Sequence, residues 1–182
     1  MTMQIQLLVS SAVCLFGVSN ALAGFVSSST LGSGENSAWL QFDFDNGHAH
    51  HVTVHWDGAL DGFQALSMVA AELDGGQLQY QSFSFGKFVT GIGIYGDYNN
   101  GEGDLWPIEN VWHYWTADGN GEWVSSMIGS DSRQLVDGSR DAWVFGSNAA
   151  PQSVPSAGSV LVIGLAAMRR RRTESQIARS TN

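Results

Sequence analysis

The sequence contains a single cysteine, Cys14, which lies in an apolar run near the N-terminus. A chain that loses this run during export has no thiol left, so disulfide bonds, cysteine-ligated zinc and cysteine catalysis are excluded for it. The hydrophobic core alone must then stabilise the fold. Seven Trp, nine Phe and four Tyr residues supply large side chains for that core.

Basic residues are scarce in the middle of the chain. Between Gly24 and Ala150, 16 residues are acidic, whereas the basic residues are Lys87, Arg133 and Arg140. Nucleic acid is excluded as a partner, because binding to phosphates needs a face rich in lysine and arginine. An acidic surface of this kind is typical of an extracellular domain that holds cations.

The sequence also lacks the common catalytic motifs. It has no Gly-x-Ser-x-Gly elbow, no phosphate-binding loop and no His-Glu-x-x-His zinc motif. Glu102 and Glu109 have the residue type of a glycosidase pair, but two carboxylates in an acidic chain carry no information. We therefore predict that the protein is not an enzyme.

The N-terminal residues are typical of a cleavable signal peptide. An apolar run over residues 7–18 is followed by Ala21 and Ala23, the small residues that signal peptidase recognises. The run is too short to span a bilayer as a stable helix. We therefore predict that residues 1–23 are removed on export and that the mature chain begins at Gly24.

The C-terminal residues contain a second apolar segment with a basic cluster behind it. Residues 151–159 are rich in proline, serine and alanine, which predicts a linker. The tail over residues 160–182 then begins with an apolar stretch. The basic cluster consists of Arg169, Arg170, Arg171 and Arg172. Arginines in this position stay on the cytoplasmic side during export, so the tail holds the chain at the membrane before processing.

Together, residues 154–158, the apolar stretch and the arginines resemble the PEP-CTERM sorting signal. That signal has a proline-rich motif, here reduced to Pro155, then a short apolar helix and a basic end; residues 173–182 extend beyond the arginines. The resemblance implies recognition by an exosortase-type membrane protease and association with the cell surface or with extracellular polysaccharide. An ordinary transmembrane tail anchor is the alternative.

The middle of the chain alternates between strand and helix patterns. Residues 40–45 and 51–57 alternate apolar and polar side chains, and the Asn46-Gly47 turn and the His-rich stretch after it connect them as a hairpin. Residues 61–73 have helical spacing, with Asp61 as the N-cap. Further strands are predicted over residues 78–85, 87–95, 111–116, 123–128 and 142–145. Residues 96–104 are predicted to be a Gly/Asn/Asp loop. Residues 24–150 are therefore predicted to be one small α+β domain, a mostly antiparallel sheet with one packed helix.

Three segments of this domain resemble the transcobalamin C-terminal-like domain of bacterial exported proteins. They are Phe85–Ile92, Trp112–Trp115 and the stretch from Ser125 to Gly146. The resemblance implies a β-grasp-like fold and binding of a corrinoid or another planar ligand.

Four aromatic residues are candidate ligand-binding residues. They are Trp112, Tyr114, Trp115 and Trp123. On a strand, Trp112 and Tyr114 face one side and Trp115 faces the other, so one set belongs to the core. The other set is a candidate stacking platform for a sugar or a planar ring. The alternative, which the residue types favour, is that these aromatic residues pack inside the fold.

Two clusters contain metal-ligating residue types. Asp97, Asn99, Glu102 and Asp104 lie in the predicted loop, and their oxygen atoms suit calcium; an ordinary solvated loop is the alternative. His48, His50, His51 and His55 form a histidine cluster whose imidazoles suit copper or zinc. Side chains four residues apart on a strand lie about 13 Å apart, so we favour solvated histidines.

These observations predict an exported, non-enzymatic binding module at the cell surface or in the extracellular matrix. Its ligand is predicted to be planar or a saccharide. The competing interpretation is a purely structural envelope protein that has no small ligand.

Overall fold

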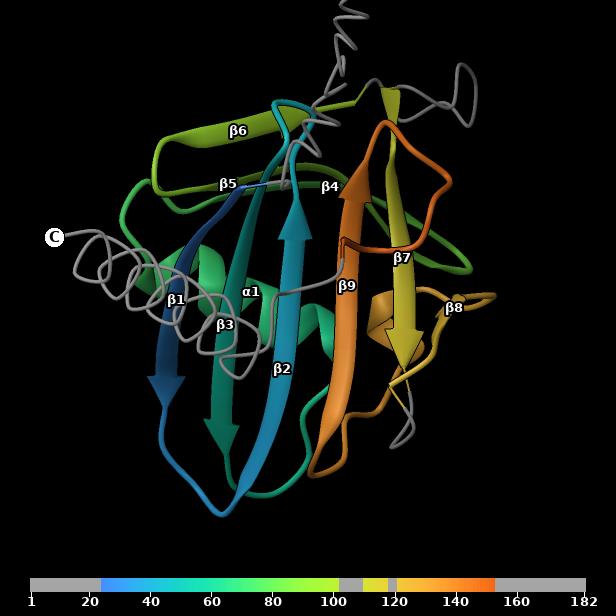
Figure 1. Ribbon diagram of the computed structural model, residues 1–182. Helices are drawn as coiled ribbons and strands as arrows, with labels where there is room; N and C mark the ends of the chain where they lie inside the picture. Colours follow the sequence, from blue (N-terminus) through green and yellow to red (C-terminus); the bar gives the residue numbers. More distant parts are fainter. Residues whose placement is uncertain (1–23, 102–109, 118–120, 153–182) are drawn as a thin grey trace, which may run out of the picture.

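A computed structural model describes residues 24–101, 110–117 and 121–152, which form two β-sheets, one α-helix and a short 3₁₀ helix (Figure 1). The predicted signal peptide, Ala21, Ala23, Pro155 and the four tail arginines lie outside the described residues, as do Glu102 and Asp104. Within the described residues, no helix is both long and apolar enough to cross a membrane.

The larger sheet has six strands in the order β1-β3-β2-β9-β7-β8. Their bounds are β1 Gly24–Gly32, β2 Asn36–Asp43, β3 His48–Trp56, β7 Trp112–Ala117, β8 Trp123–Ser125 and β9 Ser139–Phe145. The pairs β1–β3 and β2–β9 are parallel, and the other pairs are antiparallel. The predicted hairpin is confirmed as β2–β3, and its turn places Gly47 at a φ of 83°, a value that suits glycine.

The smaller sheet has three antiparallel strands in the order β4-β5-β6. They are β4 Gln77–Phe83, β5 Gly86–Ile94 and β6 Asp97–Asn100. The prediction of a loop over residues 96–104 is wrong for β6, because Asp97 to Asn100 pair with Ile94 to Gly91. Strand β1 was not predicted from the sequence either, because its serine-rich stretch does not alternate apolar and polar residues.

Helix α1 runs over Gly62–Glu72 and begins as predicted. Asp61 is its N-cap: the Asp61 carboxylate accepts from the Gln64 backbone N–H at 2.7 Å, and the Gln64 side chain accepts from the Asp61 N–H at 2.9 Å. This capping box satisfies two backbone donors that the first turn of a helix leaves unpaired. A one-turn 3₁₀ helix, η2, follows later at Ser130–Ser132.

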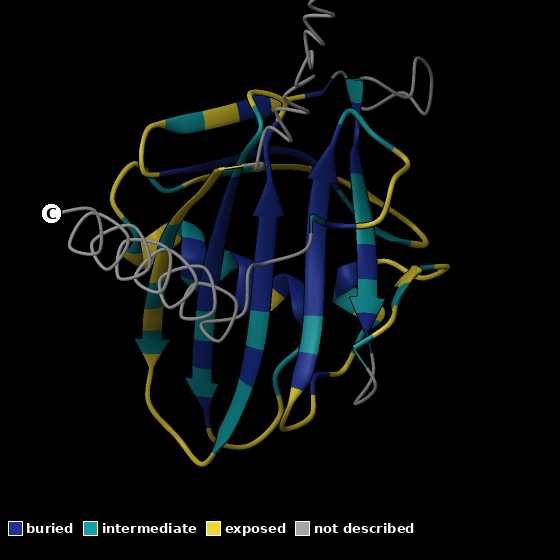
Figure 2. Ribbon diagram, in the orientation of Figure 1, coloured by how far each residue is buried: buried dark blue, intermediate teal, exposed yellow. Residues whose placement is uncertain are grey.

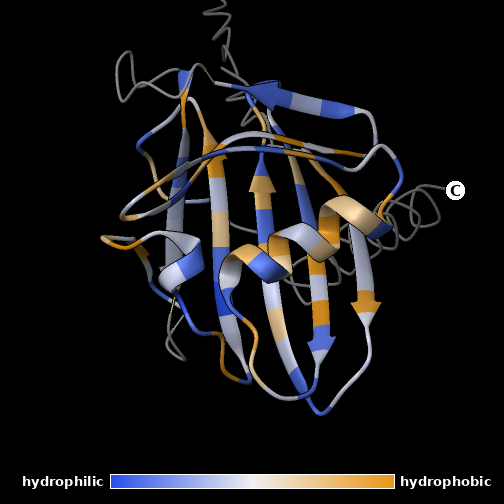
Figure 3. Cartoon of the chain, turned by 180° about the vertical axis from the view of Figure 1, so that it is seen from behind, coloured by the Kyte–Doolittle hydropathy of each residue, from blue (hydrophilic) through white to orange (hydrophobic). Residues whose placement is uncertain are grey.

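The helix and the smaller sheet lie on the same side of the larger sheet (Figures 1 and 3). Between them lies the main core, where apolar residues from both sheets and α1 are buried (Figure 2). The α+β class with one helix and mostly antiparallel pairing is therefore confirmed. The single predicted sheet is corrected to two, because the smaller sheet packs over the larger one rather than extending it.

The first residues of the predicted linker pack on the larger sheet. The Gln152 backbone N–H donates to the Asp43 carboxylate at 2.7 Å, and its carbonyl accepts from the Gln41 side chain at 3.0 Å. Pro151 is buried. The ordered packing of the domain therefore reaches Gln152, and the remainder of the predicted linker lies outside the described residues.

Candidate functional site

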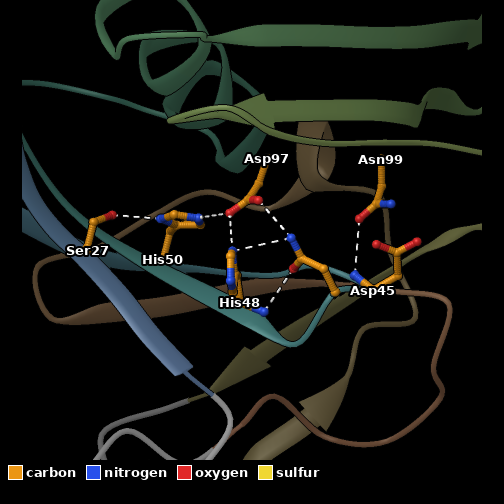
Figure 4. Close-up of polar contacts among 7 residues, drawn as sticks. Ser27, Asp45, His48, His50, Asp97 and Asn99 are labelled. Atoms are coloured by element: carbon orange, nitrogen blue, oxygen red, sulfur yellow. Dashed lines mark hydrogen bonds and ion pairs between the residues drawn. The ribbon is translucent and has the colours of Figure 1, made fainter.

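Two histidines of β3 and one aspartate of β6 meet where the two sheets approach each other (Figure 4). His48 and His50 are two residues apart on β3, so their side chains leave the same face of the strand. Asp97 is the first residue of β6 and follows the tight Tyr95-Gly96 turn. One side chain from the smaller sheet therefore faces two from the larger sheet.

The three side chains converge on one carboxylate oxygen. The Asp97 Oδ2 atom lies 2.8 Å from His48 Nδ1 and 2.7 Å from His50 Nε2. One ligand atom from each residue lies within 4.8 Å of the other two. Such mutual distances are close to those within the coordination shell of a single metal ion, so small side-chain shifts would admit an ion.

His50 is held in place by a partner on its other ring nitrogen. Its side chain is 1% exposed, and its Nδ1 atom lies 2.7 Å from Ser27 Oγ. Ser27 reaches His50 because β1 runs parallel to β3 with these two residues in register. Histidines that bind metals commonly have such a partner, which fixes the orientation and tautomer of the ring.

Asn46 supports the other side of the site from the β2–β3 turn. Its Oδ1 atom accepts from the His48 backbone N–H at 2.9 Å, which fixes the orientation of the amide. Its Nδ2 atom then donates to Asp97 Oδ1 at 2.7 Å. The second carboxylate oxygen is thereby satisfied, and Oδ2 stays directed at the two histidines.

The surroundings keep Asp97 ionised. Burial acts to raise the pKa of Asp97, but hydrogen bonds from His50, His48 and Asn46 outweigh it and lower that pKa below its ordinary value. The site therefore offers one negative charge and two imidazoles. His48 is 45% exposed, so the cluster is open to solvent on that side.

The two described residues of the predicted calcium set, Asp97 and Asn99, make different contacts in the structure. Asp97 belongs to the cluster with the histidines, whereas Asn99 uses its side-chain oxygen to accept from the Asp45 backbone N–H at 3.1 Å. Glu102 and Asp104 lie outside the described residues. The two described members lie on strand β6 and not on the predicted loop, and calcium binding by all four residues stays a prediction.

The histidine cluster also divides, because β3 alternates. His48 and His50 face the smaller sheet, and His51 and His55 leave the opposite face. The prediction of solvated histidines is wrong for His50 and His51, which are both buried. The i, i+2 spacing of His48 and His50 was visible in the sequence, and Asn46 is close to them along the chain. Ser27 becomes a neighbour of His50 through the pairing of β1 with β3, and Asp97 reaches both histidines because the smaller sheet packs on the larger one.

The four aromatic candidates do not form one platform. Trp112 and Tyr114 pack into the main core, whereas Trp115 and Trp123 form a second cluster with Ala142 and Val144. The prediction that the aromatic residues face two sides of a strand is thus confirmed. Trp112 and Tyr114 also line a pocket between β5 and β7.

Comparisons with known proteins add little. No known protein family and no curated protein sequence matches the chain. A crystal structure of a "putative metal binding protein" from Ruminococcus gnavus is similar over 60% of this chain and 95% of that one, with 13% sequence identity and a TM-score of 0.43. A similarity of that size does not establish a common fold, so the case for a metal depends on the residues of this chain.

Proposed function

We propose that the protein is a non-enzymatic binding module that holds a divalent transition-metal ion, zinc or copper, between its two sheets. The observation that carries the proposal is the convergence of His48 Nδ1, His50 Nε2 and the ionised Asp97 carboxylate on one point. Imidazole nitrogens suit zinc and copper, whereas calcium prefers an all-oxygen shell. The proposed ion therefore differs from the calcium that the sequence suggested.

The hydrogen bonds around His50 are compatible with both the free and the metal-bound state. A serine hydroxyl can donate or accept. Without an ion, His50 Nε2 carries its proton toward Asp97, and Ser27 donates to Nδ1. With an ion, Nε2 offers its lone pair to the metal, and Nδ1 donates to Ser27. Binding thus requires a change of tautomer, keeps the His50–Ser27 hydrogen bond, and replaces the hydrogen bond from His50 to Asp97 by bonds from both side chains to the metal.

Small movements are enough to admit the ion. The two nitrogen–oxygen contacts must lengthen by roughly 0.5 Å when a metal at ordinary bond lengths lies between the atoms. His48 is the more exposed histidine, and its ring can make that shift at the surface. Solvent or an exogenous ligand completes the coordination on the exposed side.

Isothermal titration calorimetry with Zn²⁺, Cu²⁺ and Ca²⁺ tests the proposal. We expect one Zn²⁺ or Cu²⁺ per chain and no Ca²⁺. His48→Gln should weaken Zn²⁺ binding by at least about tenfold. His55→Gln, on the opposite face of the same strand, is the matched control and should bind like the unaltered chain. Equal Zn²⁺ affinity for His48→Gln, or an equal loss for His55→Gln, would refute the site.

Export to the cell surface is the second part of the proposal. Its support is the signal-like N-terminus and the tail that resembles a PEP-CTERM signal. Mass spectrometry of the protein from its native host would detect cleavage after Ala23 and processing of residues 160–182. An uncut chain in the cytosol would contradict this part without affecting the metal site.

A saccharide ligand has weaker support, on the face of the larger sheet that is turned away from α1. There the Arg140 guanidinium lies 4.4 Å from the ring centre of Trp39 and 5.1 Å from that of Trp123. The arginine therefore already occupies part of the stacking surface that a sugar would use. The purely structural alternative predicts no metal binding at all, and the calorimetry above separates it from our proposal.

A further inference from the structure

A pocket of about 350 Å³ lies between β5 and β7, away from the histidine cluster. Strand β6 pairs with β5 along Gly91–Ile94, and β8 pairs with β7 along Trp115–Ala117. The first residues of β5 and β7 therefore have no neighbouring strand on the pocket side in the described part of the chain. The loop after β8 and the start of η2 close the third side.

The floor of the pocket is aromatic, and the polar atoms of Trp112 and Tyr114 already have hydrogen-bond partners. Trp112, Tyr114 and Trp143 form this floor, and the rings of Tyr114 and Trp143 lie 4.9 Å apart. The Trp112 indole N–H donates to the Asn99 carbonyl at 3.3 Å, and the Tyr114 hydroxyl donates to the Asp141 carboxylate. The floor thus offers ring surface rather than hydrogen-bonding groups, and its packing in the core makes it rigid.

The mouth of the pocket carries large apolar side chains that are left in solvent. Phe85 is 78% exposed, Met127 is 95% exposed and Ile128 is 52% exposed. Such side chains gathered at the mouth of a pocket indicate a binding site, whereas single exposed apolar residues need no explanation. An exposed methionine adapts its shape to a bound ring.

The charges at the pocket select against anions. The Asp131 carboxylate lines the wall, and its Oδ2 atom accepts from the Lys87 backbone N–H at 2.9 Å. The Lys87 ammonium is directed elsewhere, since it lies 4.1 Å from the ring centre of Phe63, which does not line the pocket. The Asp131 carboxylate therefore contributes negative charge at the pocket wall, which disfavours a bound anion.

We propose that this pocket binds a small planar aromatic molecule of one or two fused rings, neutral or cationic, independently of the metal. The volume is at the lower end of the range for ligand pockets, about 300–1,000 Å³. A corrinoid is far too large to be enclosed there. The aromatic floor and apolar mouth suit the two faces and the edge of a flat ring.

Three indoles of different charge test the proposal on the ¹⁵N-labelled protein. Indole, tryptamine and indole-3-acetate share one ring system, and the amide shifts of the protein report the place and strength of binding. We expect saturable shifts at Gly86–Val89 and Ser125–Asp131. Tryptamine should bind at least as tightly as indole, and indole-3-acetate at least about threefold more weakly than indole. No saturable shift from any of the three, shifts confined to other regions, or tightest binding of indole-3-acetate would overturn the proposal.

Two sets of variants locate the site. The double substitution Phe85→Ala with Met127→Ala should weaken indole binding by about fivefold. Both side chains are exposed, so the fold should tolerate their loss. Val136→Ala is the matched control, since Val136 is exposed but does not line the pocket. Unchanged binding by the double variant would contradict the assignment. His48→Gln should bind indole normally, and therefore failure of the metal site leaves this proposal standing.

Discussion

Strand β3 carries four histidines, and the buried histidines on its two faces differ in their hydrogen-bond partners. On the face toward the smaller sheet, both ring nitrogens of His50 have partners, Ser27 and Asp97. On the other face, His51 is also buried, but its Nε2 atom has no hydrogen-bond partner among the described residues. The ring centres of Phe25 and Trp39 lie 4.7 and 4.4 Å from the centre of the His51 ring.

The difference shows that burial alone does not make a histidine a ligand. Burial is the main cause that lowers the pKa of His51 to about 4, and electrostatic interactions with Arg140 and His50 act in the same direction, so the ring stays neutral and packs like an aromatic residue. His50 is equally buried, but a carboxylate and a hydroxyl face its two nitrogens. The partners, not the burial, therefore distinguish a candidate metal site from a packed core residue.

Removal of the shared carboxylate should have the largest effect. Asp97→Ala leaves His50 Nε2 buried without a partner, which costs about 1–3 kcal/mol in the free energy of unfolding. The same variant should lose Zn²⁺ binding, because the site loses its negative ligand. Chemical denaturation with and without Zn²⁺ measures both effects. Asp45→Ala, an exposed residue on the adjacent turn, is the control, and an equal loss of stability there would show that His50 gains nothing from Asp97.

Lowering the pH should destabilise the protein through His51, on the other face of β3, in a pH range different from that of Asp97. The pKa of His51 falls from an ordinary 6.5 to about 4 on folding. As the pH is lowered, His51 is therefore protonated in the unfolded chain before it is protonated in the folded protein. The contribution of His51 to stability is complete above pH 6.5 and is lost as the pH falls toward 4. The loss is on the order of 3 kcal/mol. The pKa of Asp97 is lowered from 3.8, so its contribution is lost at lower pH still.

His51→Leu tests this assignment. The variant should lose less stability between pH 7 and pH 4.5 than the unaltered chain, as measured by denaturant unfolding at each pH. His55 lies on the same face of β3 as His51, so His55→Leu controls for the removal of a histidine. If the two variants have the same pH dependence, then His51 is not the group that titrates.

Local signals in the sequence located the elements better than the site. Asp61 and Gln64 stand at the spacing of a capping box, and Asn46-Gly47 is a strong hairpin turn, so both features were predictable from neighbouring residues. The β5–β6 turn gave no such signal. Tyr95 and Gly96 both have positive φ angles, 54° and 91°, and tyrosine is seldom found in that conformation.

The candidate metal site depended on what the sequence did not predict. Its histidines come from β3, its carboxylate from β6 and its supporting hydroxyl from β1, and neither β6 nor β1 was predicted as a strand. Ser27 faces His50 through a parallel pairing, which no turn between the two strands reveals. Residue types with metal-binding chemistry were visible in the sequence, but the set that converges was decided by tertiary packing.

The variant with the smallest expected effect tests whether the Ser27 hydroxyl contributes to metal binding. Ser27→Ala removes the group that fixes the His50 ring, and loss of such a supporting partner weakens metal binding by about tenfold. Ser28→Ala is the matched control, because Ser28 is exposed and leaves from the opposite face of β1. Calorimetric Zn²⁺ titrations of the two variants make the comparison. If Ser27→Ala binds Zn²⁺ as tightly as Ser28→Ala does, then the His50 ring is oriented by its packing, and the hydrogen-bonded partner on its second nitrogen does not contribute to metal binding.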